Sequence, residues 1–294
     1  MNKKTVLFTD SGLGGLTIMA DFVERVKKET LPFDLDIVFY NAQKSQSEGY
    51  KVMTPEEQVE TFEKVLVSMK ERYNPDLLAI ACNSLSVVYF KTPTYKNGDL
   101  NVLDIVEVGK DLLSKEFEVP VIEIAMPTTV KSKLYSSDKR NMVSVASDIM
   151  LPNAIENHPD SDVTDNMLTE IFEKAASKMT DNSINHKEVK LFLGCTHFPI
   201  IKDKFVVNAK KFNFQIDEII NPNAVLCEDV LKQIRSWGGE LKNMNNRKPD
   251  IIVKVISRTR FRDNEVINIA KLLDGFSPQT AAALRGYELI PDLF

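Results

Sequence analysis

The sequence predicts an α/β protein made of two similar α/β domains with parallel-sheet cores. Strand-like and helix-like runs alternate along the 294 residues, the pattern restarts near the middle, and each half carries a cysteine at the end of an apolar run. Alternation of this kind is typical of parallel sheets, because each parallel connection needs a crossover that is usually a helix. The chain is long enough for two domains.

The first half shows the alternation most clearly. Strands are expected at 5–10, 35–40 and 76–82, and helices at about 16–29 and 55–73. The second helix has a full start signal, since Thr54 can cap it and Glu57 can complete a capping box. Its apolar residues form one stripe at helical spacing, consisting of Val59, Phe62, Leu66 and Met69.

The second half repeats this order. "VPVIEIAMPTT" (119–129) is similar to the opening "TVLFTDSG" as strand and polar turn, and "VKLFLGCTH" (189–197) is similar to "DLLAIACNS" (76–84) as strand, cysteine and polar turn. The repeat predicts one thiol at the carboxyl end of a strand in each half. Open α/β sheets form their ligand sites at that edge.

Composition and charge narrow the class of protein. Apolar residues make up 43% and charged residues 27% of the chain, as in globular proteins. The net charge of −5 argues against nucleic-acid binding, which needs clustered Lys and Arg, so we expect a small-molecule partner. There is no apolar run long enough to predict a membrane span, and the N-terminus lacks the apolar core of a secretory signal. We therefore expect a cytoplasmic protein that contacts neither nucleic acid nor membrane.

Cys82 ends an apolar strand and precedes Asn83 and Ser84, where a helix is expected to begin. The positive end of a helix dipole favours thiolate, the form that acts as base or nucleophile. A lone buried cysteine is usually only a small core residue. The polar residues that follow Cys82, and the matching unit in the second half, favour a functional thiol.

Cys195, Thr196 and His197 bring a thiol, a hydroxyl and an imidazole to one turn. Histidine exchanges protons near neutral pH and can assist a neighbour as acid or base. No C-x-x-C or H-x-x-x-H pair occurs, so we predict no metal site. The third cysteine, Cys227, lies in a helical pattern and is expected in the core. An odd number of widely spaced cysteines predicts reduced thiols rather than disulfides.

"FTDSGLGGLT" (8–17) places Asp10 and Ser11 at a strand end, before three glycines. A dinucleotide site is one interpretation, but Thr17 occupies the third glycine position and Asp10 would stand near the pyrophosphate. Alternatively, the glycines let the backbone approach a small ligand to which Asp10 and Ser11 point. A third alternative is that Asp10 caps the following helix.

Two kinds of chemistry fit these residues. In a covalent hydrolase or transferase, one cysteine is the nucleophile and His197 its base, but the second strand-end thiol then has no role. Two thiols facing each other across a cleft suit proton transfer at carbon. One thiolate removes a proton from one face, the opposite thiol delivers a proton to the other face, and the configuration inverts.

The motifs "DSGLGGL" (10–16), "ACNS" (81–84) and "LGCTHFP" (193–199) resemble those of the cofactor-independent glutamate racemases in the aspartate/glutamate racemase superfamily. "VPVIEIAMPTTVKSKLY" and "LPNAIEN" are similar to the segments that begin the family's second domain and carry a pocket glutamate. The resemblance runs from about residue 5 to 235. It implies an enzyme that needs no cofactor and interconverts L- and D-glutamate, supplying D-glutamate for the peptidoglycan of the cell wall.

The resemblance also implies an architecture and a set of site residues. The first domain would comprise 1–105 and 219–294 and the second 106–218, with the active site in the cleft between them and a homodimer as the assembly. Cys82 and Cys195 would be the two bases, assisted by Asp10 and His197. The substrate-binding residues would be Ser11, Asn83, Ser84, Thr129, Thr196 and Glu156.

Three departures from the family pattern bear on the substrate. The segment "NAQKSQSEGYKVM" (41–53) lacks the family's Pro-Tyr-Gly turn, Ser84 replaces a threonine, and Phe198 replaces a tyrosine. The thiols are retained, so racemisation is the first hypothesis. A racemase for aspartate or another amino acid is the second. A protein that binds an amino acid without turning it over is the third.

Overall fold

The computed structural model describes residues 3–45, 49–136, 141–184, 187–240 and 247–294. The chain separates into two compact units, one formed by 1–105 with 223–294 and the other by 106–222. Within the described residues each unit contains one parallel sheet, of six strands in the first and four in the second. The predicted α/β class with parallel-sheet cores is therefore confirmed.

The first unit alternates strands and helices through most of its length. Its elements are β1 (Lys3–Asp10), α1 (Leu16–Val26), β2 (Asp34–Asn41), the short 3₁₀ helix η1 (Tyr50–Val52), α2 (Pro55–Tyr73), β3 (Leu77–Ile80), α3 (Asn83–Tyr89), α4 (Pro93–Asn97), β4 (Val102–Asp104), α10 (Pro222–Glu240), β9 (Ile251–Ser257), α11 (Asp263–Asp274), α12 (Pro278–Arg285) and β10 (Glu288–Leu289). The strand order among the described residues is β10-β9-β2-β1-β3-β4.

The second unit has the same alternation in a shorter form. Its elements are α5 (Ile105–Leu113), β5 (Val121–Ala125), α6 (Pro127–Ser132), β6 (Met142–Ala146), α7 (Leu151–Asn157), α8 (Asp162–Asp181), β7 (Glu188–Gly194), the 3₁₀ helix η2 (Phe198–Ile201), α9 (Lys202–Lys211) and β8 (Gln215–Ile220). The strand order in the described part of this unit is β6-β5-β7-β8.

The two sheets share one topology. In each unit the first strand lies between the second and the third, and the fourth follows the third, so β2-β1-β3-β4 corresponds to β6-β5-β7-β8. The repeat seen in the sequence is therefore a repeat of structure. It makes β3 equivalent to β7, and these are the strands that precede the two cysteines.

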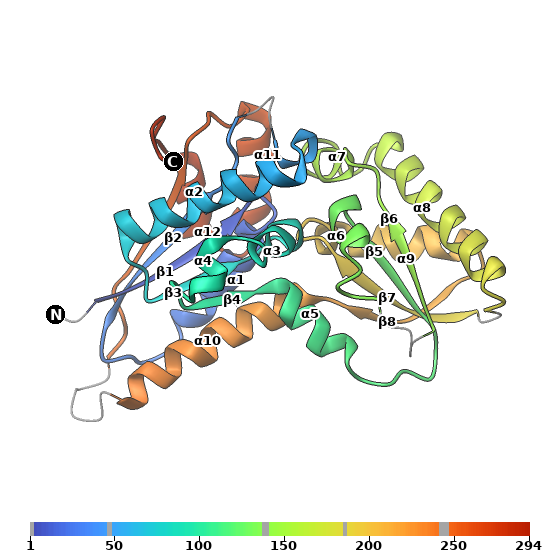
Figure 1. Ribbon diagram of the computed structural model, residues 1–294, viewed down its shortest axis with the longest axis horizontal. Helices are drawn as coiled ribbons and strands as arrows, with labels where there is room; N and C mark the ends of the chain where they lie inside the picture. The colour runs from blue at the N-terminus through green and yellow to red at the C-terminus, as the bar shows by residue number, and fades with distance from the viewer. Residues whose placement is uncertain (1–2, 46–48, 137–140, 185–186, 241–246) are drawn as a thin grey trace. The chain divides into compact units, whose positions relative to one another are not determined.

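One face of the first sheet packs against α2, while α10 lies on the other side (Figure 1). The apolar cluster beneath α2 includes, from strands and helix, Leu7, Val38, Tyr40, Leu78, Ile80, Phe62, Val65, Leu66 and Met69. The predicted capping box is present: Glu57 N donates to Thr54 Oγ1 at 3.2 Å and Thr54 N donates to Glu57 Oε2 at 2.7 Å. Helix α1 ends at Val26 rather than near Glu29, because the last turns close through 3₁₀-type bonds such as Glu29 N to Val26 O.

The second sheet packs one face against α8 and α9, which Figure 1 shows along the same side of the unit. Ile122 and Ile124 of β5 lie in this core with Phe172 and Phe205, whose ring centroids are 6.4 Å apart. These alternate residues of β5 point to one face, as the twofold period of a strand requires. Glu123 therefore points to the opposite face.

The chain passes from the second unit back to the first between residues 222 and 223. The boundary expected from the sequence was between residues 218 and 219. The difference has a simple cause. Strand β8 continues to Ile220, which pairs with Phe192 of β7, so the whole strand stays with the second sheet.

None of the helices in the described ranges combines the length and apolar character needed to cross a bilayer.

Glu123 is a buried acid within the second unit, only 2% exposed. Its Oε2 accepts a short hydrogen bond from Ser144 Oγ, while Oε1 has no hydrogen-bond partner among the described residues. Burial raises the pKa of this carboxyl, and the hydrogen bond from Ser144 offsets the rise only in part. The folded chain consequently holds a proton that the unfolded chain releases at lower pH.

This predicts that Glu123→Gln changes the pH dependence of stability. An acid with a raised folded pKa binds more protons when folded, so stability falls as pH rises from the unfolded pKa of about 4.3 through the folded pKa. Chemical denaturation at pH 5 and pH 8 should show the variant gaining stability relative to wild type as pH increases. A difference between the two proteins that is the same at both pH values would contradict the burial argument.

Candidate functional site

The first candidate site lies at the carboxyl ends of β1 and β3, which are neighbours in the sheet. Thr9 pairs with Ile80, and Ala81 N donates to Thr9 O at 2.9 Å, so Ser11 and Cys82 come next to each other just beyond the strands. After β1 the chain continues to β2, toward one edge of the sheet, and after β3 it continues to β4, toward the opposite edge. Such a reversal of strand order is where open α/β sheets bind ligands.

Cys82 is buried, with 7% of its surface exposed. Its Sγ lies 3.3 Å from Ser11 Oγ. Burial and the nearby negative charge of Asp10 raise the pKa of the Cys82 thiol, and hydrogen bonds from the Ser11 hydroxyl and from backbone amides only partly oppose this. Cys82 is therefore a protonated thiol at neutral pH, and the dipole of the seven-residue helix that follows does not outweigh burial.

Asp10 holds the loop that joins β1 to α1. Its Oδ1 accepts from Gly12 N at 3.1 Å and its Oδ2 from Gly15 N at 2.7 Å, while Ser11 Oγ lies 3.5 Å from Oδ1. A Cβ added to Gly15 would lie 3.0 Å from both Asp10 Cβ and Asp10 Oδ2, so any other residue there would have to displace the Asp10 side chain slightly.

These contacts argue against the dinucleotide interpretation, and Asp10 closes the loop before α1 rather than capping the helix, whose N-cap is Gly15. The Gly12 and Gly15 amides that would have to meet a pyrophosphate already donate to a carboxylate. Asn41 Nδ2 also donates to Gly12 O at 2.9 Å, which fixes the same loop from β2. The loop is thus rigidly built around Asp10, with Ser11 turned toward the thiol.

Asn83 and Ser84 form the first turn of α3 next to Cys82, as the sequence predicted. Asn83 is 2% exposed, whereas Ser84 is partly exposed. Ser86 N donates to Cys82 O at 2.9 Å, so the cysteine is tied to the helix start. The polar residues predicted for the first half are therefore brought together in one unit.

The second candidate site occupies the equivalent edge of the other sheet, beyond β5 and β7. Ala125 pairs with Gly194, and a Cβ added to Gly194 would lie 2.8 Å from Ala125 Cβ, so only glycine lets the two strand ends approach this closely. Cys195 follows directly and is 6% exposed. Thr129, fully buried in α6 after β5, lies on the segment that leaves the neighbouring strand.

A carboxylate, an imidazole and the thiol form a chain within the second unit. Glu156 Oε1 of α7 lies 2.7 Å from His197 Nε2, and His197 Nδ1 lies 3.8 Å from Cys195 Sγ and 3.5 Å from Thr196 Oγ1. A carboxylate accepts only, so Nε2 carries a proton and donates to Glu156. Nδ1 then faces the thiol, either to accept its proton or, when protonated, to donate to a thiolate.

Burial would lower the pKa of His197, but the Glu156 carboxylate and Cys195 outweigh it and raise that pKa well above its usual value. Glu156 is itself 8% exposed. The resemblance implied that Glu156 binds substrate. In the structure Glu156 contacts His197, so its direct effect is to orient the imidazole and to favour the protonated form of His197.

All three cysteines are free and buried, and Cys227 lies in the core side of α10 as expected. Within the described ranges, no three His, Cys, Asp or Glu side chains are grouped so that they could hold a metal ion.

The segment 41–53 is described except for residues 46–48, which lie outside the described ranges, so the altered turn is defined only at its two ends. At its far end is Tyr50, which is 7% exposed and belongs to the same apolar cluster as Cys82. The sequence pattern indicated no role for Tyr50. A single aromatic residue in a polar stretch was the only signal for it.

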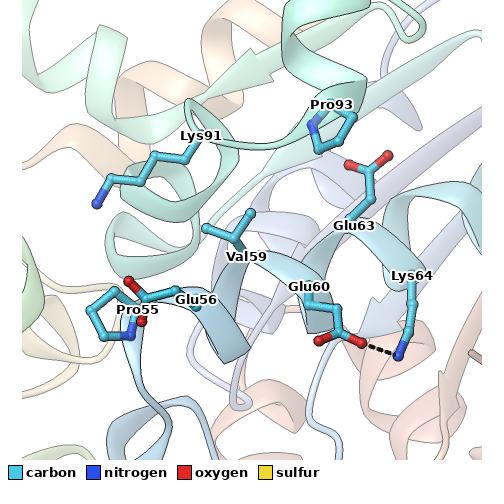
Figure 2. Close-up of a pocket in the computed structure, with 8 residues that line it drawn as sticks. All are labelled: Pro55, Glu56, Val59, Glu60, Glu63, Lys64, Lys91 and Pro93. Carbon is cyan, nitrogen blue, oxygen red and sulfur yellow. Dashed lines mark hydrogen bonds and ion pairs between the residues drawn. The ribbon is translucent and has the colours of Figure 1, made fainter.

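A surface hollow of about 550 Å³ lies elsewhere on the first unit, against α2 (Figure 2). Three of its charged side chains have partners: Glu60 pairs with Lys64 at 2.7 Å, and Glu63 Oε1 accepts from Thr94 Oγ1 at 2.9 Å. It contains no predicted site residue. The hollow is therefore a feature of the charged surface rather than part of either thiol site.

Known proteins share both the sequence pattern and the fold. No protein-family model matches the chain. A glutamate racemase of Neisseria meningitidis is 25% identical over 248 residues, covering 82% of this chain and 83% of that protein. A glutamate racemase of Streptococcus agalactiae is 25% identical over 209 residues, covering 69% and 72% respectively. The solved structure of a Francisella tularensis glutamate racemase in complex with D-glutamate is 20% identical, with a TM-score of 0.68 over 93% of this chain and 94% of that one.

The chain is therefore an α/β protein whose sequence and fold are similar to those of glutamate racemases. The predicted resemblance to the aspartate/glutamate racemase superfamily is confirmed, and the relatives just described are glutamate racemases.

The Glu156 and His197 contact predicts a pH-dependent effect of Glu156→Gln. His197 has a folded pKa raised above its unfolded value of about 6.5, so its stabilising contribution is complete below about pH 6.5 and lost as pH rises through the folded pKa. At pH 6.5 the free energy of unfolding should be about 1–3 kcal/mol higher for wild type than for the variant, as expected for a charged hydrogen bond. At pH 9 the difference should be smaller. Urea denaturation at the two pH values measures this.

Glu107→Gln is the matched control for that experiment. Glu107 pairs at 2.7 Å with Lys110 on the exposed surface of α5. Its loss should have a small effect that does not change over this pH interval. If Glu156→Gln behaves in the same way as Glu107→Gln, the buried pair does not set the charge of His197.

Proposed function

We propose that the protein is a cofactor-independent amino-acid racemase that uses Cys82 and Cys195 as its two bases, with D/L-glutamate as the leading substrate. The observation that carries the proposal is the equivalence of the two thiols. Each follows the third strand of a sheet with the same strand order, beside the polar turn that leaves the first strand. A hydrolase with one cysteine nucleophile would require only one of these sites.

Proton transfer balances between the two thiols. One cysteine, as thiolate, takes the α-proton and becomes a thiol, and the bonding electrons remain on the α-carbon and its carboxylate. The other cysteine delivers its proton to the opposite face and becomes a thiolate. After one turnover the cysteine that began as thiolate carries the proton and the other cysteine is the thiolate. Proton exchange with solvent then returns both cysteines to their starting forms.

The surroundings of the two cysteines suit opposite starting roles. Cys82 has a raised pKa and so starts as the proton donor. Cys195 faces a His197 whose pKa is also raised, and a protonated Nδ1 stabilises a thiolate there. His197 thus assists Cys195 when that thiol exchanges a proton, and Asp10 and His197 act on the thiols rather than on the substrate.

The substrate must be held by donors that stabilise the developing charge on its carboxylate. Ser11, Asn83 and Ser84 border Cys82, Thr196 adjoins Cys195, and Thr129 lies in α6 on the segment that leaves the strand next to β7, so both units offer hydroxyl or amide groups near the thiol. Enclosing the two thiols around one substrate would exclude water and strengthen these contacts.

The names of the relatives support glutamate as substrate, and the complex of the Francisella tularensis glutamate racemase with D-glutamate supports an amino acid as the ligand. The physiological role that follows is supply of D-glutamate for peptidoglycan by a cytoplasmic enzyme, with a homodimer as the proposed assembly. The changed segment 41–53 favours one alternative substrate class, aspartate or another amino acid.

Proton NMR in heavy water tests the proposed reaction. L-glutamate and D-glutamate, incubated separately with the protein under reducing conditions, should each lose the α-proton signal while circular dichroism decays toward zero. Loss of the signal from neither enantiomer, with folded protein and reduced thiols, would reject glutamate and require a panel of other enantiopure amino acids. Stabilisation by glutamate without exchange would indicate a binding protein.

Replacing either thiol should stop racemisation. Cys82→Ser and Cys195→Ser should each reduce the rate by about 10²–10⁴-fold, because a hydroxyl is too weak an acid to replace a positioned thiol in proton transfer. Cys227→Ser is the control, since that thiol is equally buried but lies in α10, and it should retain the rate. Full racemisation by either of the first two variants would falsify the two-base assignment.

A further inference from the structure

Three neighbouring strands of the first sheet end in buried polar residues. Asp10 closes β1, Asn41 closes β2 and Ser257 closes β9, and the strand pairing places all three in one row. Each of them is at most 2% exposed. A buried strand end needs no amide for packing, and a buried amide is costly unless it is hydrogen-bonded. The hydrogen bonds of Asn41 therefore indicate what this residue does.

The Asn41 side chain uses both ends of its amide. Its Nδ2 donates to Gly12 O at 2.9 Å, and its Oδ1 accepts from Gln43 N at 3.1 Å. Turning the amide over would bring Oδ1 against the Gly12 carbonyl and Nδ2 against the Gln43 amide, so these contacts select one orientation. Ser257 Oγ lies 3.5 Å from Oδ1, also on the acceptor side. Asn41 consequently presents a donor, in a fixed place, to the loop that follows β1.

The residue that receives this donor directly follows Ser11. Gly12 N donates to Asp10 Oδ1 at 3.1 Å while Gly12 O accepts from Asn41, so Gly12 is held through both its N–H and its carbonyl. Ser11 is thus placed between two anchored residues, and its Oγ lies 3.3 Å from Cys82 Sγ. A side chain of β2 thereby helps to fix a contact between the ends of β1 and β3.

The Ser11 contact favours thiolate at a buried sulfur. Burial and the charge of Asp10 raise the pKa of Cys82, and the hydroxyl and the backbone amide of Ser11 both counteract that rise. Tyr50 of η1 also interacts with Cys82, but burial raises the pKa of its hydroxyl, which therefore stays neutral. Because both donors of Ser11 move with the loop, the proton affinity of Cys82 depends on where the loop is held.

We propose that Asn41 is a positioning residue for the first thiol, which holds the loop after β1 so that Ser11 hydrogen-bonds to Cys82; its part in catalysis rests on the racemase function proposed above. Asn41 acts through Gly12 and Ser11 rather than on a substrate. Without its donor, the Gly12 carbonyl is free to turn, the contact of Ser11 with the sulfur lengthens, and Cys82 becomes a weaker acid.

Alkylation of the thiols tests this role without any substrate. Asn41→Leu removes the amide at similar size, and iodoacetamide at pH 8.5 reacts with the thiolate form of cysteine. Mass spectrometry should show Cys82 of the folded variant alkylated about 10-fold more slowly than in wild type, the lower end of what a hydrogen bond to a charged group contributes. Cys195 is the internal reference and should react at the wild-type rate. Asn41→Ala, which needs less space, is the second variant and should give the same result.

A double-mutant cycle with Ser11→Ala distinguishes positioning from packing. If Asn41 acts through Ser11, Asn41→Leu should slow the alkylation of Cys82 no further in the Ser11→Ala background. Full additional slowing in that background would overturn the inference. An unchanged rate in the single variants, or a faster rate because the thiol has become exposed, would overturn it as well.

Asn101→Leu is the matched control. Asn101 Nδ2 donates to Asp76 O at 3.0 Å, which is the same kind of bond, but at the start of β3 rather than at its end. This variant should leave the alkylation of Cys82 unchanged. Slowing equal to that of Asn41→Leu, or equal slowing of Cys195, would show a general loosening of the fold and overturn the inference.

The heavy-water exchange assay connects the role to the reaction. In Asn41→Leu, kcat should fall together with the reactivity of Cys82, while KM changes by less than about threefold, since no substrate contact is lost. An unchanged kcat would overturn the role in catalysis. If wild type exchanges the α-proton of no amino acid while the alkylation cycle gives the expected result, the racemase proposal fails and the positioning of Ser11 by Asn41 stands.

Discussion

The parallel pairing of the first and third strands in each unit is the constraint on which both sites depend. Because parallel strands end at the same edge, β1 and β3 deliver Ser11 and Cys82 to adjacent positions with no further contact needed to hold them. The same pairing of β5 with β7 places Cys195 beside the turn that leaves β5. Gly194 serves this geometry, since it stands where a Cβ would collide with the neighbouring strand.

Burial then makes the two thiols unlike each other. Around Cys82 it combines with the charge of Asp10 to keep the proton on sulfur. Beside Cys195, burial lowers the pKa of the His197 imidazole, but the Glu156 carboxylate and Cys195 outweigh burial and raise that pKa. The difference between the two surroundings arises from partners supplied by α7 and by the loop after β1 rather than from the thiols themselves.

The same physics separates buried polar groups that are fully paired from one that is only half paired. Asp10 and Tyr40 are buried, and their polar atoms are satisfied by the chain. Glu123 is also buried, but among the described residues it is paired through only one oxygen. An acid left half paired inside a sheet carries a cost in stability that grows with pH.

The sequence by itself determined the α/β class, the repeat, the two strand-end cysteines and most of their polar neighbours, because strand periodicity, capping signals and strand-end polarity are local properties of the chain. It could not decide among three roles for Asp10, nor connect Glu156 to His197 across 41 residues, nor place Asn41 against Gly12. Those depend on which atoms meet after strands far apart in the chain have paired. Only the tertiary structure brings such atoms within hydrogen-bond distance and withdraws them from water, and burial is what sets their charge.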